Sequence, residues 1–101
     1  MILYTVKLKK SAKIDIVKVY DYIEQMLFAP IAAKNFLSGI YSCIANLEYN
    51  AGIFAISAFN DVLCYGMNAR TINYKGFVII YTIHSRYVLV HRIIHGSLIK
   101  N

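Results

Sequence analysis

The stretch Phe77-Val78-Ile79-Ile80-Tyr81-Thr82-Ile83 decides the fold, because all of its side chains except that of Thr82 are apolar. A strand of this composition cannot face water on either side, so it is expected in the centre of a sheet. Lys75-Gly76 comes just before it and predicts a two-residue hairpin turn, since glycine readily supplies a positive φ. Residues 69–74 on the far side of this turn are expected to form the partner strand.

The two flanks of the chain complete the sheet. Residues 84–86 are expected to turn the chain, and 87–94 to form the last long strand. At the N-terminus, Ile2, Tyr4, Val6 and Leu8 occur at every second position. This period of two predicts a first strand.

Two amphipathic helices are predicted between the first strand and the C-terminal strands. Ser11 is expected to cap the first helix through its hydroxyl group, and Pro30 suits the first position of the second helix, where its missing N–H costs nothing. Apolar side chains recur at helical spacing in both helices: Ala12, Ile16, Val19, Tyr20, Ile23 and Leu27 in the first, and Ala33, Phe36, Leu37, Ile40, Ile44 and Leu47 in the second. The short connection predicts an antiparallel hairpin.

These elements predict an α+β fold made of an N-terminal strand, an antiparallel two-helix hairpin and a C-terminal three-stranded antiparallel meander. Residues 50–68 are expected to form a packed loop with at most a short helical turn. A chain of 101 residues suits one domain, 1–101. The helical hairpin is expected to cover one sheet face and to leave a positive, uncovered face on the other side.

Composition excludes several classes of protein. The 58% share of hydrophobic residues argues against disorder. The longest uncharged stretch, 35–47, is shorter than the roughly 20 residues of a membrane-spanning helix, and the N-terminus lacks a charged leader. A soluble, non-secreted protein is therefore expected. Cys43 and Cys64 fit no metal-binding spacing and are expected to be buried thiols, so no metal or cofactor is predicted.

The net charge of +6 is unevenly distributed, because no acidic residue follows Asp61. The basic residues after that point are Arg70, Lys75, Arg86, Arg92 and Lys100. A C-terminal half whose charged residues are all basic attracts nucleic acid or an acidic protein. Charge alone does not choose between these two partners, and it also fits a role in solubility only.

Four blocks of sequence carry a more specific signal. They are DIVKVYDYI at 15–23, PIAAKNF at 30–36, RTI with FVIIY across 70–81, and VLVHRIIHG at 88–96. In this order they resemble the RelE/ParE superfamily of toxins from type II toxin–antitoxin systems. The departures are Phe77 where the family has tyrosine, Val90 where it has isoleucine, and Lys100 as the only basic residue after Gly96.

The resemblance implies a bacterial, cytoplasmic toxin that inhibits growth, as in plasmid stabilization, and that is silenced by a cognate antitoxin protein. ParE-like members act on DNA gyrase, and RelE-like members are ribosome-dependent mRNA endonucleases. An inactive member that only binds its antitoxin is the third alternative. The apolar groove expected between sheet and helices would suit an amphipathic helix or an added strand of the antitoxin.

The candidate site residues depend on the branch. RNA cleavage needs a base, an acid and cations that stabilise phosphate charge. The RelE-like reading assigns these roles to Arg70, Arg92 and His95, with His95 as a general acid close to Arg70. The ParE-like reading makes Arg70, Lys75 and Arg92 target-binding residues. It is favoured, because the loop at 58–69 holds no lysine or arginine and Val78 replaces a common arginine.

Structural roles are also open for these residues. His95 can be satisfied by backbone, and Arg92 can pair with Glu24, Glu48 or helix-end carbonyls. Strand periodicity predicts His91 and His95 on one sheet face and Arg92 on the other, unless the strand contains a bulge or ends before His95.

Overall fold

The computed structural model describes residues 3–99. The elements are β1 (Thr5–Leu8), α1 (Lys10–Asp21), the π-helical turn η1 (Tyr22–Met26), α2 (Pro30–Asn50), α3 (Asn60–Leu63), β2 (Arg70–Tyr74), β3 (Phe77–His84), β4 (Tyr87–His95) and the 3-10 turn η2 (Gly96–Leu98). This order confirms the predicted α+β class. Ile2 of the predicted first strand and Lys100 of the tail lie outside the described residues.

The sheet has four strands in the order β1-β4-β3-β2, with β1 parallel to β4 and the other pairs antiparallel. β3 is central, and its middle residues from Val78 to Thr82 are buried, as the sequence predicts. The turn before it has φ values of 47° at Lys75 and 86° at Gly76. Two positive φ angles are characteristic of a type I′ hairpin turn, so this prediction is also confirmed.

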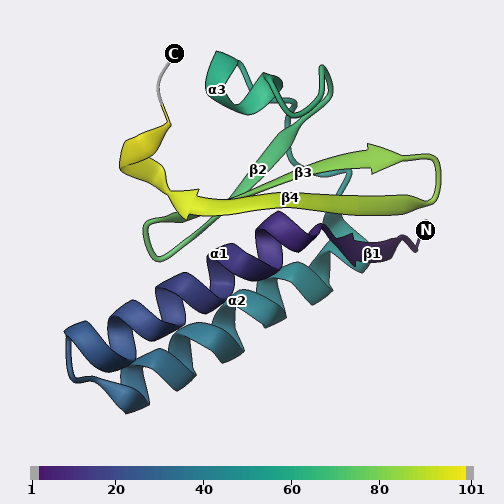
Figure 1. Cartoon of the computed structure of the whole chain (residues 1–101). Coiled ribbons are helices and arrows are strands. Elements are labelled where there is room, and N and C mark those ends of the chain that lie inside the picture. The colour runs from purple at the N-terminus through teal and green to yellow at the C-terminus, as the bar shows by residue number, and fades with distance from the viewer. Residues whose placement is uncertain (1–2, 100–101) are drawn as a thin grey trace.

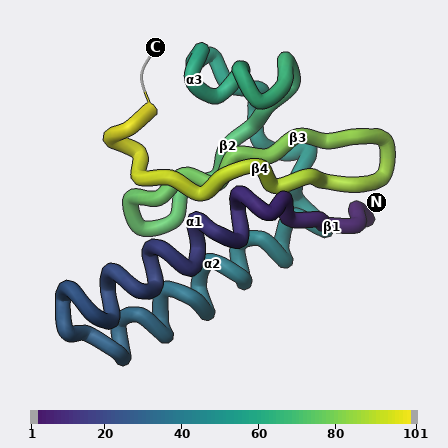
Figure 2. Tube along the Cα trace, in the orientation of Figure 1, coloured from purple at the N-terminus to yellow at the C-terminus, as the bar shows by residue number. Residues whose placement is uncertain are grey.

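The helices α1 and α2 form a hairpin that covers one face of the sheet (Figure 1). Figure 2 shows them running side by side in opposite directions. The main core lies between this hairpin and the sheet: its fully buried side chains include Ile16, Ile40, Leu47, Ile79, Tyr81, Val88 and Val90. Each such side chain contributes about 1.5–3 kcal/mol through burial of apolar surface.

Two predictions about the helices need correction, and one is confirmed. Pro30 is the first residue of α2, as predicted. Ser11 does not cap α1, which begins at Lys10 after Lys9, and no side chain caps it. Leu27, predicted in the apolar stripe, is 54% exposed. The π-helical turn at Tyr22–Met26 is wider than an α-helical turn, and the α-helical spacing that placed Leu27 in the stripe no longer holds there.

The second face of the sheet, which we call the open face, is not bare as expected. Figure 1 places α3 on the side of the sheet opposite the helical hairpin. A smaller core forms there from Val62, Ala69, Val78 and Ile80. The expectation of a wholly uncovered face is therefore wrong at the β2–β3 side, because the apolar residues of the predicted loop need a surface to pack on.

The segment between α2 and β2 is only partly packed. Val62 is fully buried, whereas Ile53 is 78% exposed. Cys64 is exposed, so its predicted burial is wrong, while Cys43 is half-buried and burial raises the pKa of its thiol. Among residues 3–99, no helix combines the length and the apolar content that crossing a membrane requires.

Candidate functional site

The free edge of β4 explains where Ser11 and Asp15 lie. β1 ends at Leu8, opposite Val90, but β4 continues to His95. Over this stretch α1 takes the place of a neighbouring strand: the Ser11 hydroxyl donates to the His91 carbonyl (2.7 Å), and Asp15 Oδ2 accepts from the Ile93 N–H (2.9 Å). These bonds satisfy backbone groups that an edge strand would otherwise leave unpaired.

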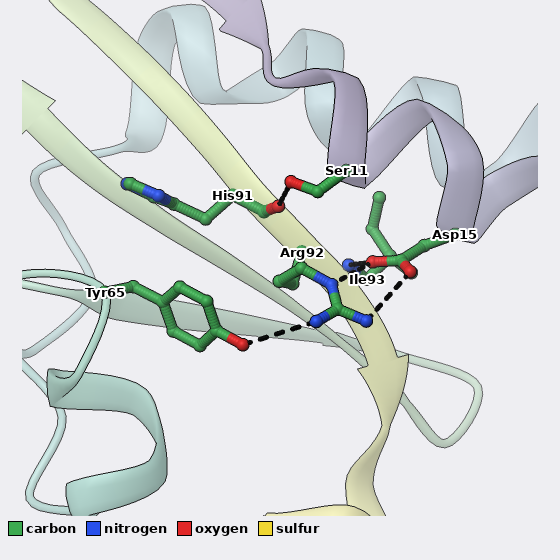
Figure 3. Close-up of polar contacts among 6 residues, drawn as sticks. All are labelled: Ser11, Asp15, Tyr65, His91, Arg92 and Ile93. Atoms are coloured by element: carbon green, nitrogen blue, oxygen red, sulfur yellow. Dashed lines mark hydrogen bonds and ion pairs between the residues drawn. The ribbon is translucent and has the colours of Figure 1, made fainter.

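The carboxylate of Asp15 also fixes Arg92. Nε of Arg92 lies 2.7 Å from Oδ2, and Nη2 lies 3.0 Å from Oδ1, which is a two-pronged ion pair (Figure 3). Hydrogen bonding to Asp15 raises the pKa of the guanidinium, and Tyr65 accepts a third, longer bond of 3.5 Å. Arg92 therefore pairs with Asp15, and the partners that the sequence offered, Glu24 and Glu48, are wrong.

A bulge in β4 overturns the predicted distribution of its polar side chains. Ile80 pairs with Arg92 and Tyr81 pairs with Val90, so His91 is an extra residue without a partner on β3. His91 lies on the open face, where Nε2 is 2.8 Å from Thr82 Oγ1. The prediction that His91 and His95 share a face is therefore wrong, because the extra residue reverses the alternation beyond it.

His95 lies towards the helical hairpin. Its ring meets Phe77 edge to face at 5.5 Å, and Phe77 packs on Phe36 of α2. Its Nδ1 accepts from the Ser97 N–H (3.2 Å). This local bond to the backbone is the structural role that the sequence left open for His95.

Arg70 reaches the end of α2. Its Nη1 donates to the carbonyls of Gly52 and Phe54, just beyond the C-terminus of the helix. The Tyr81 hydroxyl donates to the neighbouring carbonyl of Ala51 (2.7 Å). Burial raises the pKa of Tyr81 to about 12, and the charge of Arg70 opposes that rise. Arg70 and Tyr81 together satisfy backbone carbonyls of the segment that follows α2.

The three residues of the nuclease reading are not brought together. Arg70 pairs with Tyr81, whereas His95 pairs with Phe77, four residues further along β3. Four residues of strand correspond to roughly 13 Å, so the prediction that His95 lies close to Arg70 is wrong. Lys75 is exposed in the β2–β3 turn, with its ammonium 5.6 Å from the centre of the Tyr74 ring.

Sequence reasoning missed a polar network on the open face. The Thr82 hydroxyl lies between Nε2 of His84 and Nε2 of His91. A hydroxyl has one proton, so with both rings neutral it donates to one imidazole and accepts from the other. Burial, followed by the charges of Lys9 and His84, lowers the pKa of His91. His91 is therefore neutral at neutral pH.

The outer side of the helical hairpin carries an apolar depression, which we call the hairpin groove. A cavity of about 380 Å³ is lined by Lys10, Lys13, Ile14, Val17 and Lys18. Val17 also lines an adjoining cavity of about 220 Å³, together with Ile16, Tyr20, Leu37 and Tyr41. Ile14 and Val17 are 42% and 57% exposed. Ile14 and Val17 form an apolar floor, and Lys10, Lys13 and Lys18 lie around it.

No group of three or more His, Cys, Asp or Glu side chains within residues 3–99 is placed to hold a metal ion.

The family model described as "ParE toxin of type II toxin-antitoxin system, parDE" matches residues 6–99. The chain belongs to this family. The match confirms the superfamily resemblance found in the four sequence blocks. A solved structure, "Chromosomal ParDE TA system from P. aeruginosa", is similar in fold, with a TM-score of 0.75 and 18% sequence identity over 92% of this chain and 96% of that chain. No protein with a curated description matches the sequence significantly.

Proposed function

We propose that this chain stops bacterial growth by binding DNA gyrase, and that it carries out no reaction of its own. Membership of the ParE toxin family supports the toxin role, and the resemblance to ParE-like members supports gyrase as the target. The proposal places the protein in the cytoplasm, where gyrase acts on DNA.

The main support for this proposal is that Arg70, Arg92 and His95 lie apart from one another in the fold. An RNA-cleaving site needs its acid, base and cations within hydrogen-bond reach of one phosphate. Here the Arg92 guanidinium is paired with Asp15, and Arg70 is bonded to the end of α2. His95 contacts Phe77 at the other end of the sheet. These positions support inhibition by contact.

The same contacts indicate different roles for the three residues proposed for target binding. Arg70 and Arg92 act as positioning residues, because Arg70 binds the segment that follows α2 and Arg92 binds α1 through Asp15. Lys75 lies exposed at a hairpin tip with no carboxylate partner among the described residues. Lys75 is therefore the residue of this set that we propose to contact the target.

We propose the hairpin groove as the seat of the antitoxin. Its floor at Ile14 and Val17 is apolar and exposed, and Lys10, Lys13 and Lys18 surround it. A groove of this kind fits an amphipathic helix whose apolar side chains enter it and whose acidic side chains meet the lysines. The antitoxin partner is therefore expected to present an acidic amphipathic helix.

Induced expression in a bacterial host tests the proposed target. We expect filamentous cells and an SOS response, both suppressed by co-expression of the antitoxin. Cleavage of translated messages at codon positions without DNA damage would contradict gyrase binding and indicate the RelE-like nuclease. Normal growth together with a stable antitoxin complex would indicate an inactive member.

A further inference from the structure

One end of the open face gathers cationic and polar side chains from three strands and from the residue before α1. These side chains form the open-face patch: Lys7, Lys9, Thr82, His84, His91 and Tyr87. The Lys7 ammonium lies 4.8 Å from the centre of the Tyr87 ring, and the His84 ring stacks on Tyr87 at 5.0 Å. The network of Thr82 then links His84 to His91.

The lysines of the open-face patch share one side of the chain. Lys7 is in β1, and Lys9 follows in extended backbone with φ −67° and ψ 156°. Residues two apart in extended backbone point the same way and lie roughly 7 Å from one another. Both side chains are exposed. The patch therefore presents two neighbouring ammonium groups beside an imidazole.

The positive charge of the patch is not neutralised within the part of the chain that the structure describes. Neither Lys7 nor Lys9 forms an ion pair with a carboxylate there, and the nearby Asp15 is occupied by Arg92. Burial, and after it the charge of Lys9, lowers the pKa of His91, so this lysine also acts on the imidazole of the patch. Like charges held together without a counter-charge favour an anionic ligand.

The patch differs from a protein-docking surface in having no exposed apolar anchor. None of its side chains is a large exposed hydrophobic group, and Tyr87 is only partly exposed beneath Lys7 and His84. Stable protein contacts are usually centred on such anchors. Contacts to phosphate need only cations and hydrogen-bond donors. The Tyr87 ring already contacts Lys7 and His84, so it is poorly placed to stack on a nucleic-acid base. A nucleic acid would therefore be bound through its phosphate backbone.

We propose that the open-face patch binds the phosphodiester backbone of a nucleic acid without sequence preference. Lys7 and Lys9 contact phosphate oxygens, and His84 donates a hydrogen bond from the ring beside them. This inference goes beyond the proposed function and does not depend on it. If gyrase is the target, the toxin would meet the enzyme together with its DNA.

The test measures binding of the purified full chain to fluorescently labelled nucleic acids by anisotropy over a series of salt concentrations. A duplex DNA and a single-stranded RNA of equal charge identify the source of the phosphates, and binding to either supports the proposal. We expect affinity to fall steeply with salt, since bound phosphates release counterions. The double variant Lys7→Glu/Lys9→Glu should bind at least about tenfold more weakly, with a salt slope smaller by roughly two.

The control is Lys34→Glu, which reverses one charge at an exposed residue of α2, whereas the double variant reverses two. It should change affinity by less than about twofold, as expected for a charge outside the contact. Lys7→Gln and Lys9→Gln serve as milder variants, and circular dichroism confirms folding of each. Equal loss in Lys34→Glu and the double variant would overturn the proposal. Stronger binding of an acidic peptide than of either nucleic acid would also overturn it, and so would the absence of binding at low salt.

Discussion

The hairpin groove and the open-face patch are both rich in lysine, but they differ in what lies between the lysines. In the groove, Lys10, Lys13 and Lys18 surround exposed Ile14 and Val17. In the patch, Lys7 and Lys9 lie beside a polar network and an aromatic ring that is already engaged. An apolar floor favours an amphipathic protein segment, whereas lysines without apolar neighbours favour a phosphate group. Positive charge alone therefore indicates a binding surface, and the side chains between the charges determine which kind of ligand binds there.

The largest expected effect comes from removing the support that the two surfaces share. Asp15→Ala breaks the pair with Arg92 and frees the Ile93 N–H. The Arg92 side chain is 35% exposed, so the loss should lie below the roughly 3–5 kcal/mol of a fully buried ion pair. We expect the free energy of unfolding from urea denaturation to fall by about 2–3 kcal/mol, as for lost hydrogen bonds to a charged group. Asp21→Ala on the exposed side of the same helix is the control and should be nearly neutral. A fully stable Asp15→Ala would show that α1 is not held through this carboxylate.

The second effect separates the two surfaces. Val17→Asp puts a charge into the floor of the hairpin groove, and loss of an interface anchor costs about 2 kcal/mol or more. Antitoxin affinity, measured by calorimetry, should fall about thirtyfold or more, while binding of nucleic acid stays unchanged. Met67→Asp makes a similar change at a side chain that is 86% exposed outside the groove, and it should leave both unchanged. Undiminished antitoxin binding by Val17→Asp would remove the groove as the docking site.

A third change is expected to lower stability without affecting binding at either surface. Tyr81→Phe removes the hydrogen bond to Ala51 and leaves a buried carbonyl without that donor. The expected loss of stability is about 1–3 kcal/mol, with antitoxin and nucleic-acid affinities retained in the folded fraction. Thermal unfolding measures it, and Tyr49→Phe on the exposed side of α2 is the matched control. If both variants lose the same stability, the hydrogen bond at the end of α2 contributes nothing.

The smallest expected effect is a dependence of stability on pH that comes from His91 of the open-face patch. The pKa of His91 in the folded chain lies below its ordinary value of 6.5, chiefly because of burial. Between those two values the unfolded chain binds more protons, so the free energy of unfolding decreases as the pH falls below about 6.5. His91→Gln should flatten this part of the stability profile. An unchanged slope in His91→Gln would mean that His91 is not the titrating group.

The sequence predicted what local pattern determines. An apolar run such as 77–83 has to be buried on both sides, and Lys75-Gly76 accepts the positive φ angles of its turn. Pro30 marks the start of α2 because few other positions tolerate proline. These features need no knowledge of neighbouring elements, and all of them were confirmed.

The site residues could not be predicted in the same way, because their roles depend on long-range register. The bulge at His91 is defined only against β3, yet it determines which face each later side chain of β4 occupies. Asp15 is needed because β1 ends before β4, a difference in strand length that a local pattern does not show. One signal was present: Asp15 lies between Ala12 and Ile16 in the apolar stripe of α1, where a charge requires a buried partner.

The most direct test of the gyrase proposal is a supercoiling assay with purified gyrase, relaxed plasmid, ATP and increasing amounts of this toxin. We expect supercoiling to decrease as toxin is added and to recover when the antitoxin is supplied, with messenger RNA left intact in a parallel translation reaction. Gyrase that keeps full activity at toxin concentrations that arrest translation would contradict gyrase binding as the mechanism.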